Sequence, residues 1–327
     1  MNHPRRRATL TCLAAGLLTA ALPAVSAAAY PDKPIRLVVP FPPGQGADIL
    51  ARLIGQHLAA ALGQPIVVEN KVGAGGIIGT AFAAKAAPDG YTLYMGSSGP
   101  LAIGPHVYKA VGFDTLKDFA PISNIASVTQ VLVTAPASQL ASAKDVVERA
   151  RAQPGMVPFG SAGSGTTSHL TMELFTQMSG ISLSHVPYKG SSTSMIDVMA
   201  GRVPLMFDSL PGVLTNVKSG SLRAIAVASA QRDPLLPNVP TVAESGVPGF
   251  ATSGWIGLLA PARTPPQIVD QLHTAVAKAL KSEAVKKRMS ELAFTPIGNS
   301  PAEFQTFLSK EVALWGGVAA KAGVQKE

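Results

Sequence analysis

The sequence predicts an α/β protein built as two lobes with a central cleft. Short apolar runs alternate with segments of helical periodicity, first over residues 35–95 and again over residues 141–228. Strand–turn–helix units repeated in this way are typical of a parallel sheet flanked by helices. About 300 residues suffice for two such units. Ligands of these sheets bind at the carboxyl ends of strands and between domains, so the cleft is the expected site.

The first 29 residues predict a cleavable secretory signal. Three arginines stand at 5–7, an uncharged apolar run covers 8–22, and small residues close the segment at 25–29. This is the order of regions in an export signal. The run is shorter than the ~20 apolar residues that a spanning helix needs, and Pro23 interrupts the segment. We therefore expect a mature protein that starts near Ala28 and works outside the cytoplasm.

Composition excludes several classes of function. Cys12, the only cysteine, lies in the signal segment, so the mature chain has no disulfide and no thiolate metal ligand. Lys and Arg number 27 against 19 Asp and Glu, and loss of the three signal arginines leaves a net charge of +5. These charges are scattered, without the basic stripe and neighbouring aromatics of a nucleic-acid binder. A modest positive field does suit anionic small molecules.

The elements of the first unit follow from apolar spacing and turn signals. We expect Asp48 to cap a helix that carries Leu50, Ile54 and Leu58 on one face and stops at Gly63. Strands are expected at 35–40, 66–69 and 91–95, and a second helix follows the glycines at 73–76 and runs to 87.

The second unit repeats the pattern after an extended stretch over 119–134. Its strands are expected at 156–159, 184–187, 205–207 and 222–228, and its helices at 141–152, 169–178 and 194–200. The chain then returns through an extended segment at 254–260. Thr264 is expected to cap the next helix, with Pro265 at its first position, and a closing helix covers 301–320.

Few residues carry recognisable chemistry. The loop 160–167 has glycines spaced as in a phosphate loop, but Thr166 stands where the essential lysine belongs. The glycines at 73–79 miss the dinucleotide fingerprint, and no two histidines of the mature chain have the i, i+4 metal spacing. We therefore predict no catalytic residue, no metal and no cofactor, and hence no enzyme.

Some residues allow two interpretations. The loop at 160–168 is suited to hold an anion at a helix start, or is a plain strand-to-helix turn. A helix cap alone would explain Asp48. His169 is either a ligand contact or part of a helix start, and Asp208 either faces the cleft or serves a turn.

Six segments, in order along the chain, resemble the Bug family, the periplasmic solute receptors of tripartite tricarboxylate transporters. They cover residues 40–52, 66–76, 88–93, 160–170, 185–190 and 254–262. The resemblance implies a periplasmic-binding-protein fold of the Venus flytrap kind, type II-like, without catalysis. Residues 30–126 and 254–327 would form lobe 1, and residues 127–253 an inserted lobe 2. Extended segments near 121–134 and 251–260 would cross between them.

The resemblance also implies a ligand and partners. The ligand would be a small carboxylate, namely a di- or tricarboxylate, an acidic amino acid or an aromatic acid. The partners would be the permease subunits of the transporter, or a sensor kinase if the closed receptor signals instead, and the protein would be a monomer in the periplasm. The residues also allow an exported enzyme with Tyr188 and Lys189 as an acid/base pair, or a structural or adhesive protein.

Ligand contacts carried over from the family fall on both lobes. Lobe 1 would supply Phe41, Gly44, Gln45, Gly46, Asp48, Ser97, Ser98 and Gly99, and lobe 2 would supply Ser161, Gly163, Gly165, Thr166, Thr167, His169, Tyr188, Lys189, Gly190 and Asp208. The first loop departs from the family pattern, since Gln45 replaces a glycine and Ala47 a threonine. The identity of the ligand therefore does not transfer from relatives.

Overall fold

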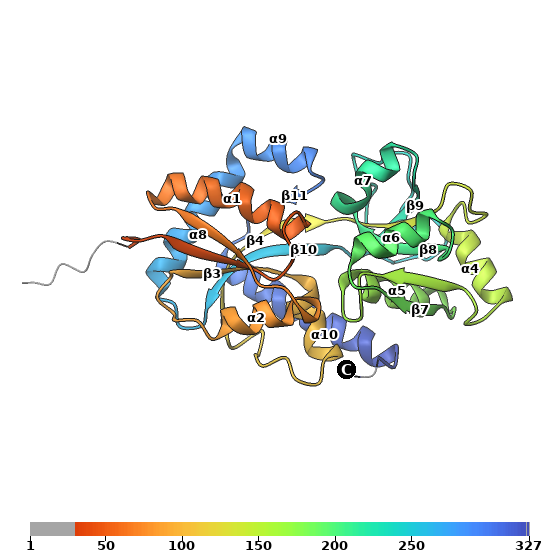
Figure 1. Cartoon of the computed structure of the whole chain (residues 1–327), viewed down its shortest axis with the longest axis horizontal. Helices are drawn as coiled ribbons and strands as arrows, with labels where there is room; N and C mark the ends of the chain where they lie inside the picture. The colour runs from red at the N-terminus through yellow and green to blue at the C-terminus, as the bar shows by residue number, and fades with distance from the viewer. Residues whose placement is uncertain (1–29, 325, 327) are drawn as a thin grey trace, which may run out of the picture.

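The structure is a computed structural model that describes residues 30–324 and 326, so the expected signal segment lies outside the described residues. Two α/β lobes lie side by side along the long axis of the molecule (Figure 1). The first lobe holds β1 (Ile35–Val39), α1 (Gly46–Leu62), β2 (Ile66–Asn70), η1 (Ala74–Gly76), α2 (Ile77–Ala84), β3 (Thr92–Ser97), η2 (Gly99–Ile103), α3 (Gly104–Val107), β4 (Phe119–Val128), β10 (Gly254–Pro261), α8 (Pro266–Lys281), α9 (Glu283–Glu291), β11 (Thr295–Pro296) and α10 (Pro301–Lys321).

The second lobe is continuous in sequence. It holds β5 (Gln130–Thr134), α4 (Ala143–Ala152), β6 (Pro158–Ser161), α5 (Thr167–Ser179), β7 (Ser184–Pro187), α6 (Ser191–Met199), β8 (Leu205–Ser209), α7 (Leu210–Lys218) and β9 (Arg223–Val227). The expected strands and helices are present within a few residues. The sequence did not predict α7 in this lobe, nor η1, η2, α3, α9 and β11 in the first lobe.

Each lobe has one mixed sheet. The first has the order β11-β4-β10-β3-β1-β2, and the second the order β7-β6-β8-β5-β9. β1 is parallel to β2 and β3, whereas β10 is antiparallel to its neighbours β3 and β4. The antiparallel strands belong to the segments where the chain changes sheets, since β4 ends at Val128 and β5 begins at Gln130 in the other sheet. The predicted α/β class is confirmed, with antiparallel pairs added at these crossings.

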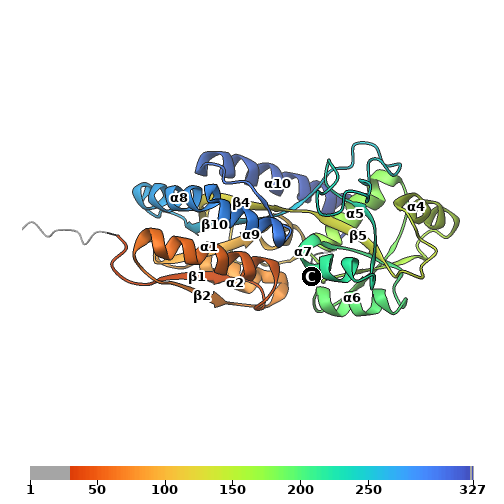
Figure 2. The same cartoon turned by 90° about the horizontal axis from the view of Figure 1, so that it is seen from above.

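Helices cover both faces of each sheet. In the first lobe, α1, α8 and α9 share one apolar cluster with the sheet, and η2 and α10 share the cluster on the other face. Figure 2 shows α10 running along the first lobe toward α5. Leu170 of α5 packs in that second cluster, and Gln177 Nε2 donates to Val318 O at 2.8 Å. The lobes therefore touch along α5 and α10, on one side of the cleft.

Helix α1 shows how the sequence builds this frame. Leu50, Ile54 and Leu58 repeat at i, i+4 and are fully buried, and each buried side chain of this size contributes about 1.5–3 kcal/mol to folding. Gly63 ends the helix in the left-handed conformation at φ 71°, and its N–H donates to Ala59 O. A residue without a Cβ adopts this conformation at little cost.

Two expected helix caps are wrong. Helix α1 begins at Gly46, so Asp48 lies in its first turn, and Gln45 holds the cap position. Helix α8 begins at Pro266 after Pro265, and the Thr264 hydroxyl donates to Pro261 O at 2.7 Å instead. In both cases a proline or glycine turn positions the backbone, and the polar side chain stabilises that turn rather than the helix end.

Candidate functional site

A cavity of about 780 Å³ lies between the two sheets, and we call it the cleft cavity. Both lobes line it, at the carboxyl ends of β1, β3, β6 and β8. Its wall comprises Pro40, Phe41, Pro42, Gly44–Ala47, Ile49, Val72–Gly76, Ser97–Gly99, Tyr108, Val128, Gln130, Ala162–Ser164, Thr166–Ser168, Tyr188–Ser192, Met195, Asp208, Ser209, Pro211, Gly212, Gly254–Ile256 and Phe294.

Six helices begin at this wall. The cap residues of α1, α2, η2, α5, α6 and α7 are Gln45, Gly76, Ser98, Thr166, Gly190 and Ser209, and all six line the cavity. None of these cap side chains accepts a hydrogen bond from a backbone N–H of its own helix. A helix N-terminus carries about half a positive charge. The wall is therefore electropositive even where it has no cationic side chain.

Three of these helix starts leave amides open. Within the described residues, the N–H groups of 46–48 in α1, 167–169 in α5 and 191–193 in α6 have no hydrogen-bond acceptor. The first amides of a helix find no partner inside it, so they need a side chain, water or ligand. Since α1 belongs to one lobe and α5 and α6 to the other, an anion between the lobes would meet donors from both.

Hydroxyl groups complete the polar wall. Ser98 Oγ and Thr167 Oγ1 lie 2.8 Å apart, so the two lobes are joined by a hydrogen bond across the cleft. Tyr108 donates its hydroxyl to Ser164 O at 3.2 Å, also from one lobe to the other. The Tyr188 hydroxyl is engaged by Asp197 at 2.7 Å, away from Lys189.

In the described part of the chain, the cavity wall contains one Lys, one Asp and no Arg or Glu. Lys189 is exposed at the rim, and Asp208 is 6% exposed. The Asp208 carboxylate accepts hydrogen bonds from the Ser191 hydroxyl and from the Ser209 N–H. Burial raises the pKa of this carboxyl, although the hydrogen bonds from Ser191 and Ser209 work against the shift. Backbone amides and hydroxyls, rather than ionised side chains, therefore dominate the chemistry of the cavity.

Fourteen of the eighteen carried-over contact residues lie on this wall. Asp48, Ser161, Gly165 and His169 are the four that do not. Asp48 is buried beneath the first loop. Its carboxylate accepts hydrogen bonds from the Gly44 N–H and the Asn70 side chain, and it forms an ion pair with Arg52 at 2.9 Å. Burial raises its pKa, but the hydrogen bonds from Arg52, Gly44 and Asn70 outweigh that effect and lower it. Asp48 thus fixes the loop that faces the cavity.

His169 and Ser161 support the second loop in the same way. The rings of His169 and His185 stack with centroids 3.8 Å apart, and His185 stacks on Phe159 in turn. Ser161 Oγ lies 2.6 Å from His185 Nε2 and accepts the Gly163 N–H. Burial, and then the neighbouring His169, lowers the pKa of His185 to about 3. His169 Nδ1 also accepts the Gly165 N–H at 3.3 Å, so this ring stack holds the glycine loop.

Other wall residues have no strong sequence signal. Gln130 and Trp255 lie where the chain crosses between sheets, and Phe294 follows α9. Trp255 is buried, and its Nε1–H donates to Glu311. The glycines at 73–76 also line the cavity, although the sequence indicated only that a helix follows them. Periodicity cannot reveal contacts that depend on how distant loops meet.

The described residues hold no group of three or more His, Cys, Asp or Glu side chains suited to bind a metal ion. No helix of this part of the chain is long and apolar enough to cross a membrane.

The fold and the polar cleft between two lobes define a solute-binding receptor. The model of the tripartite tricarboxylate transporter family receptor matches residues 50–324. The protein BugT of Bordetella pertussis is 39% identical over 302 residues, which cover 92% of this chain and 93% of that protein. The chain belongs to this receptor family.

Solved structures agree with that assignment. An R. palustris protein with adipate is 38% identical and has a TM-score of 0.85, over 91% of this chain and all of that one. MatC from Rhodopseudomonas palustris, with bound malate, is 30% identical with a TM-score of 0.81, over 89% of this chain and all of that one. The expected two-lobed binding-protein fold is confirmed.

Proposed function

We propose that this protein is an exported receptor that captures a small carboxylate in the cleft cavity for a tripartite tricarboxylate transporter. The observation that carries the proposal is the set of open amides at the starts of α1, α5 and α6, on both sides of the cavity. Hydrogen bonds to a charged group contribute about 1.5–3 kcal/mol each. A few of them are enough for micromolar affinity.

The relatives support this ligand class. Adipate and malate, the molecules named for two structures that this chain resembles, are both dicarboxylates. We propose as ligand contacts the carried-over residues that line the cavity, Phe41, Gly44–Gly46, Ser97–Gly99, Gly163, Thr166, Thr167, Tyr188–Gly190 and Asp208. Asp48, Ser161, Gly165 and His169 would act indirectly, by fixing the loops.

Capture would depend on closure of the lobes. We place the hinge at the two crossings, near the expected boundaries 126/127 and 253/254, where β4 passes to β5 and where the chain returns to β10. A ligand that touches both lobes binds the closed form better than the open form, and this difference drives closure.

The site offers little for catalysis. Ser161 and His185 have the contact of a nucleophile and its base, but Ser161 is fully buried and off the wall. Tyr188 donates to Asp197 and so does not pair with Lys189 as an acid/base couple. We therefore propose that the receptor binds its ligand without converting it.

A thermal-shift screen of the mature protein against a panel of carboxylic acids tests this function. The protein is unfolded and refolded first, so that any co-purified ligand is removed. Ligand at ~100 times its dissociation constant adds about 2.7 kcal/mol to the free energy of unfolding. We expect a saturable shift with one class of acid and no product by mass spectrometry. A flat panel, or turnover of the acid, would contradict the proposal.

A further inference from the structure

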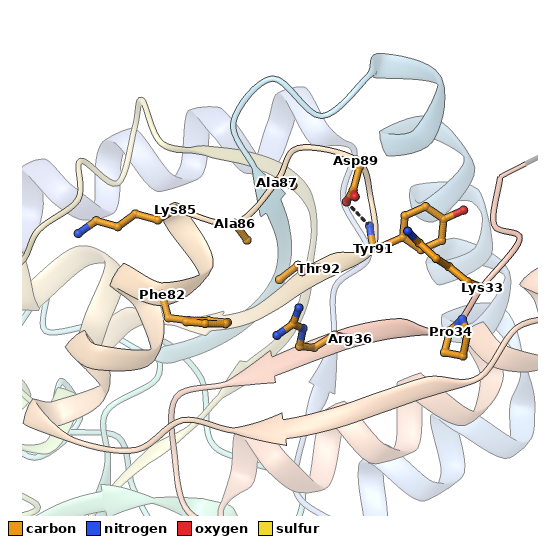
Figure 3. Close-up of a pocket in the computed structure, with 10 residues that line it drawn as sticks. All are labelled: Lys33, Pro34, Arg36, Phe82, Lys85, Ala86, Ala87, Asp89, Tyr91 and Thr92. Atoms are coloured by element: carbon orange, nitrogen blue, oxygen red, sulfur yellow. Dashed lines mark hydrogen bonds between the residues drawn. The ribbon is translucent and has the colours of Figure 1, made fainter. Parts of the chain in front are cut away.

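A second hollow lies on the outer side of the first lobe, away from the cleft. This outer pocket has a volume of about 520 Å³. Figure 3 shows its wall, which consists of Lys33, Pro34, Arg36, Phe82, Lys85, Ala86, Ala87, Asp89, Tyr91 and Thr92. No part of the ligand chemistry described above involves these residues.

The pocket exists because α2 is short. Its eight residues end at Ala84, and the loop that follows leaves the amino ends of β1 and β3 uncovered. Arg36 is the one exposed residue in the otherwise buried strand β1. A charged residue inside an apolar strand indicates a sheet face that meets solvent or a partner.

Cations outnumber acids around the pocket. Lys33 Nζ lies 4.3 Å from the centroid of the Tyr91 ring, and Lys71 Nζ lies 4.2 Å from that of Phe82. Arg36 and Lys71 share a single carboxylate, Glu69, at 3.5 and 2.7 Å.

Two further lysines form no ion pair within the described residues. Lys33 and Lys85 have no ion-pair partner among the residues that the structure describes. Asp89 is the acid of the pocket wall, and its carboxylate accepts the Tyr91 N–H at 3.0 Å. The surface therefore carries a net positive charge.

Exposed apolar side chains lie on the neighbouring β2–α2 segment. Four of the ten exposed large hydrophobic residues in the described chain, Val67, Val72, Ile78 and Phe82, come from the β2–α2 segment. β2 is also the last strand of its sheet, so one of its edges is unpaired. A group of exposed apolar side chains on one face marks a candidate protein interface.

The same surface continues to the cleft. Ile78 lies one helical turn from Phe82. Ile78 also packs against Gly73, since a Cβ on Gly73 would come within 2.6 Å of the Ile78 Cδ1. Val72 and Gly73 belong to the cleft wall. A partner seated on the α2 face would therefore lie next to a segment that lines the cleft cavity.

We propose that Lys33, Arg36, Lys71, Phe82 and Lys85, here called the basic surface, dock an acidic segment of a membrane subunit of the transporter. The segment would present Asp or Glu side chains to the lysines and an apolar side chain to Phe82. The inference rests on the proposed function, since it assumes a transporter partner, but it concerns a face that does not contact the ligand.

The test compares two charge-reversal variants. K33E/K85E changes the two lysines of the basic surface that lack ion pairs. K281E/K287E makes the same change in charge at the C-terminal end of α8 and in α9, where both lysines are exposed and also lack ion pairs among the described residues. Each ligand-loaded receptor is titrated onto the transporter's own membrane subunits in nanodiscs of uncharged lipid, by biolayer interferometry at low salt.

We expect K33E/K85E to associate about tenfold more slowly, because charges at the rim of an interface steer encounter. K281E/K287E should associate like the wild type. Phe82→Ala should speed dissociation, because it removes an apolar anchor without changing charge. Thermal unfolding and the ligand dissociation constant of each variant show that the fold and the cleft are intact.

Equal association by both charge variants would overturn the docking proposal. So would a loss confined to binding of anionic vesicles of phosphatidylglycerol and phosphatidylcholine, since the basic surface would then serve a lipid. Failure of the wild type to bind any carboxylate would instead overturn the proposed function. The two failures are therefore distinguishable.

Discussion

The cleft cavity and the outer pocket owe their positive potential to different chemical groups. The cleft cavity presents backbone amides and hydroxyls that are held by buried groups, with Lys189 as the cation of its wall. The outer pocket presents lysine and arginine side chains over aromatic rings, on an exposed face. Fixed dipoles need no rearrangement to receive an anion, whereas long cationic side chains act at a distance and are screened by salt. The comparison assigns capture to the first hollow and recognition of a partner to the second.

Helix starts elsewhere in the molecule sharpen this contrast. Ser142 and Ser300 close the starts of α4 and α10 with complete capping boxes. A capping side chain satisfies the first amides of its helix. The starts of α1, α5 and α6 at the cleft cavity therefore differ from those of α4 and α10, although α9 also begins, at Ser282, without a side-chain cap.

The largest expected effect comes from removal of one cleft amide. Thr167→Pro deletes the N–H at the first position of α5, where a proline fits the helix. Thr166 is already extended at ψ 161°, as a residue before proline must be. We expect the carboxylate dissociation constant to rise by about 10- to 100-fold, since a hydrogen bond to a charged group is worth about 1.5–3 kcal/mol. Isothermal titration calorimetry measures the change.

Thr167→Ala is the matched control, because it removes the hydroxyl that meets Ser98 and keeps the amide. It should weaken binding by less than Thr167→Pro. Equal losses in the two variants would show that the hydroxyl, and not the amide, holds the ligand.

Gly46→Pro tests the opposite wall. It deletes the first amide of α1 after Gln45, which has an extended ψ of 162°. A Cβ at this position would meet Phe294 at 3.6 Å, an ordinary contact. Gly46→Ala should therefore bind nearly as the wild type does, whereas Gly46→Pro should lose about tenfold in affinity. Calorimetry on the pair decides whether lobe 1 donates to the ligand.

Asp208 should make the free energy of unfolding depend on pH. Its carboxyl is neutral in both states at pH values well below its ordinary pKa of 3.8, and burial raises the pKa in the folded state. As the pH rises, the unfolded chain ionises first, so the free energy of unfolding falls until the folded pKa is passed. Asp208→Asn lacks this loss. Thermal unfolding between pH 3.5 and 7 should show the variant gaining stability relative to wild type as the pH rises. A constant difference would contradict the raised pKa.

The smallest effect is expected from salt on ligand binding. Raising NaCl from low to high concentration should change the ligand dissociation constant by less than about threefold, because the donors of the cleft are short-range dipoles. Docking through the basic surface should weaken by about tenfold over the same range. A ligand affinity that falls as steeply as docking would remove the distinction between the two hollows.

The sequence predicted the elements better than the site. Strands and helices were found because apolar residues such as Leu50, Ile54 and Leu58 repeat at helical spacing, which depends only on neighbours in the chain. Most of the family-derived contacts line the cavity because they lie on loops at strand ends. Asp48 and His169 were placed among the contacts, yet each lies beneath its loop, since sequence alone does not tell whether a polar side chain faces the ligand or the backbone that holds it.

Contacts between segments that lie far apart in the chain could not be predicted from the sequence. Gln130 and Trp255 line the cavity because the chain crosses between sheets there, and the outer pocket exists because α2 ends early. The sequence assigned the crossing segments and the second helix, but it did not tell how wide a gap they leave.

The most direct test of the account is calorimetry with a dicarboxylate and its diamide. Adipate and adipamide have the same length, but only adipate carries the negative charge that open amides and helix starts favour. Each is titrated into refolded mature protein, together with malate and malamide. We expect micromolar binding of at least one of the acids and binding about 100-fold weaker for its amide. Equal affinity for an acid and its amide would contradict the claim that the helix starts of the cleft select an anion.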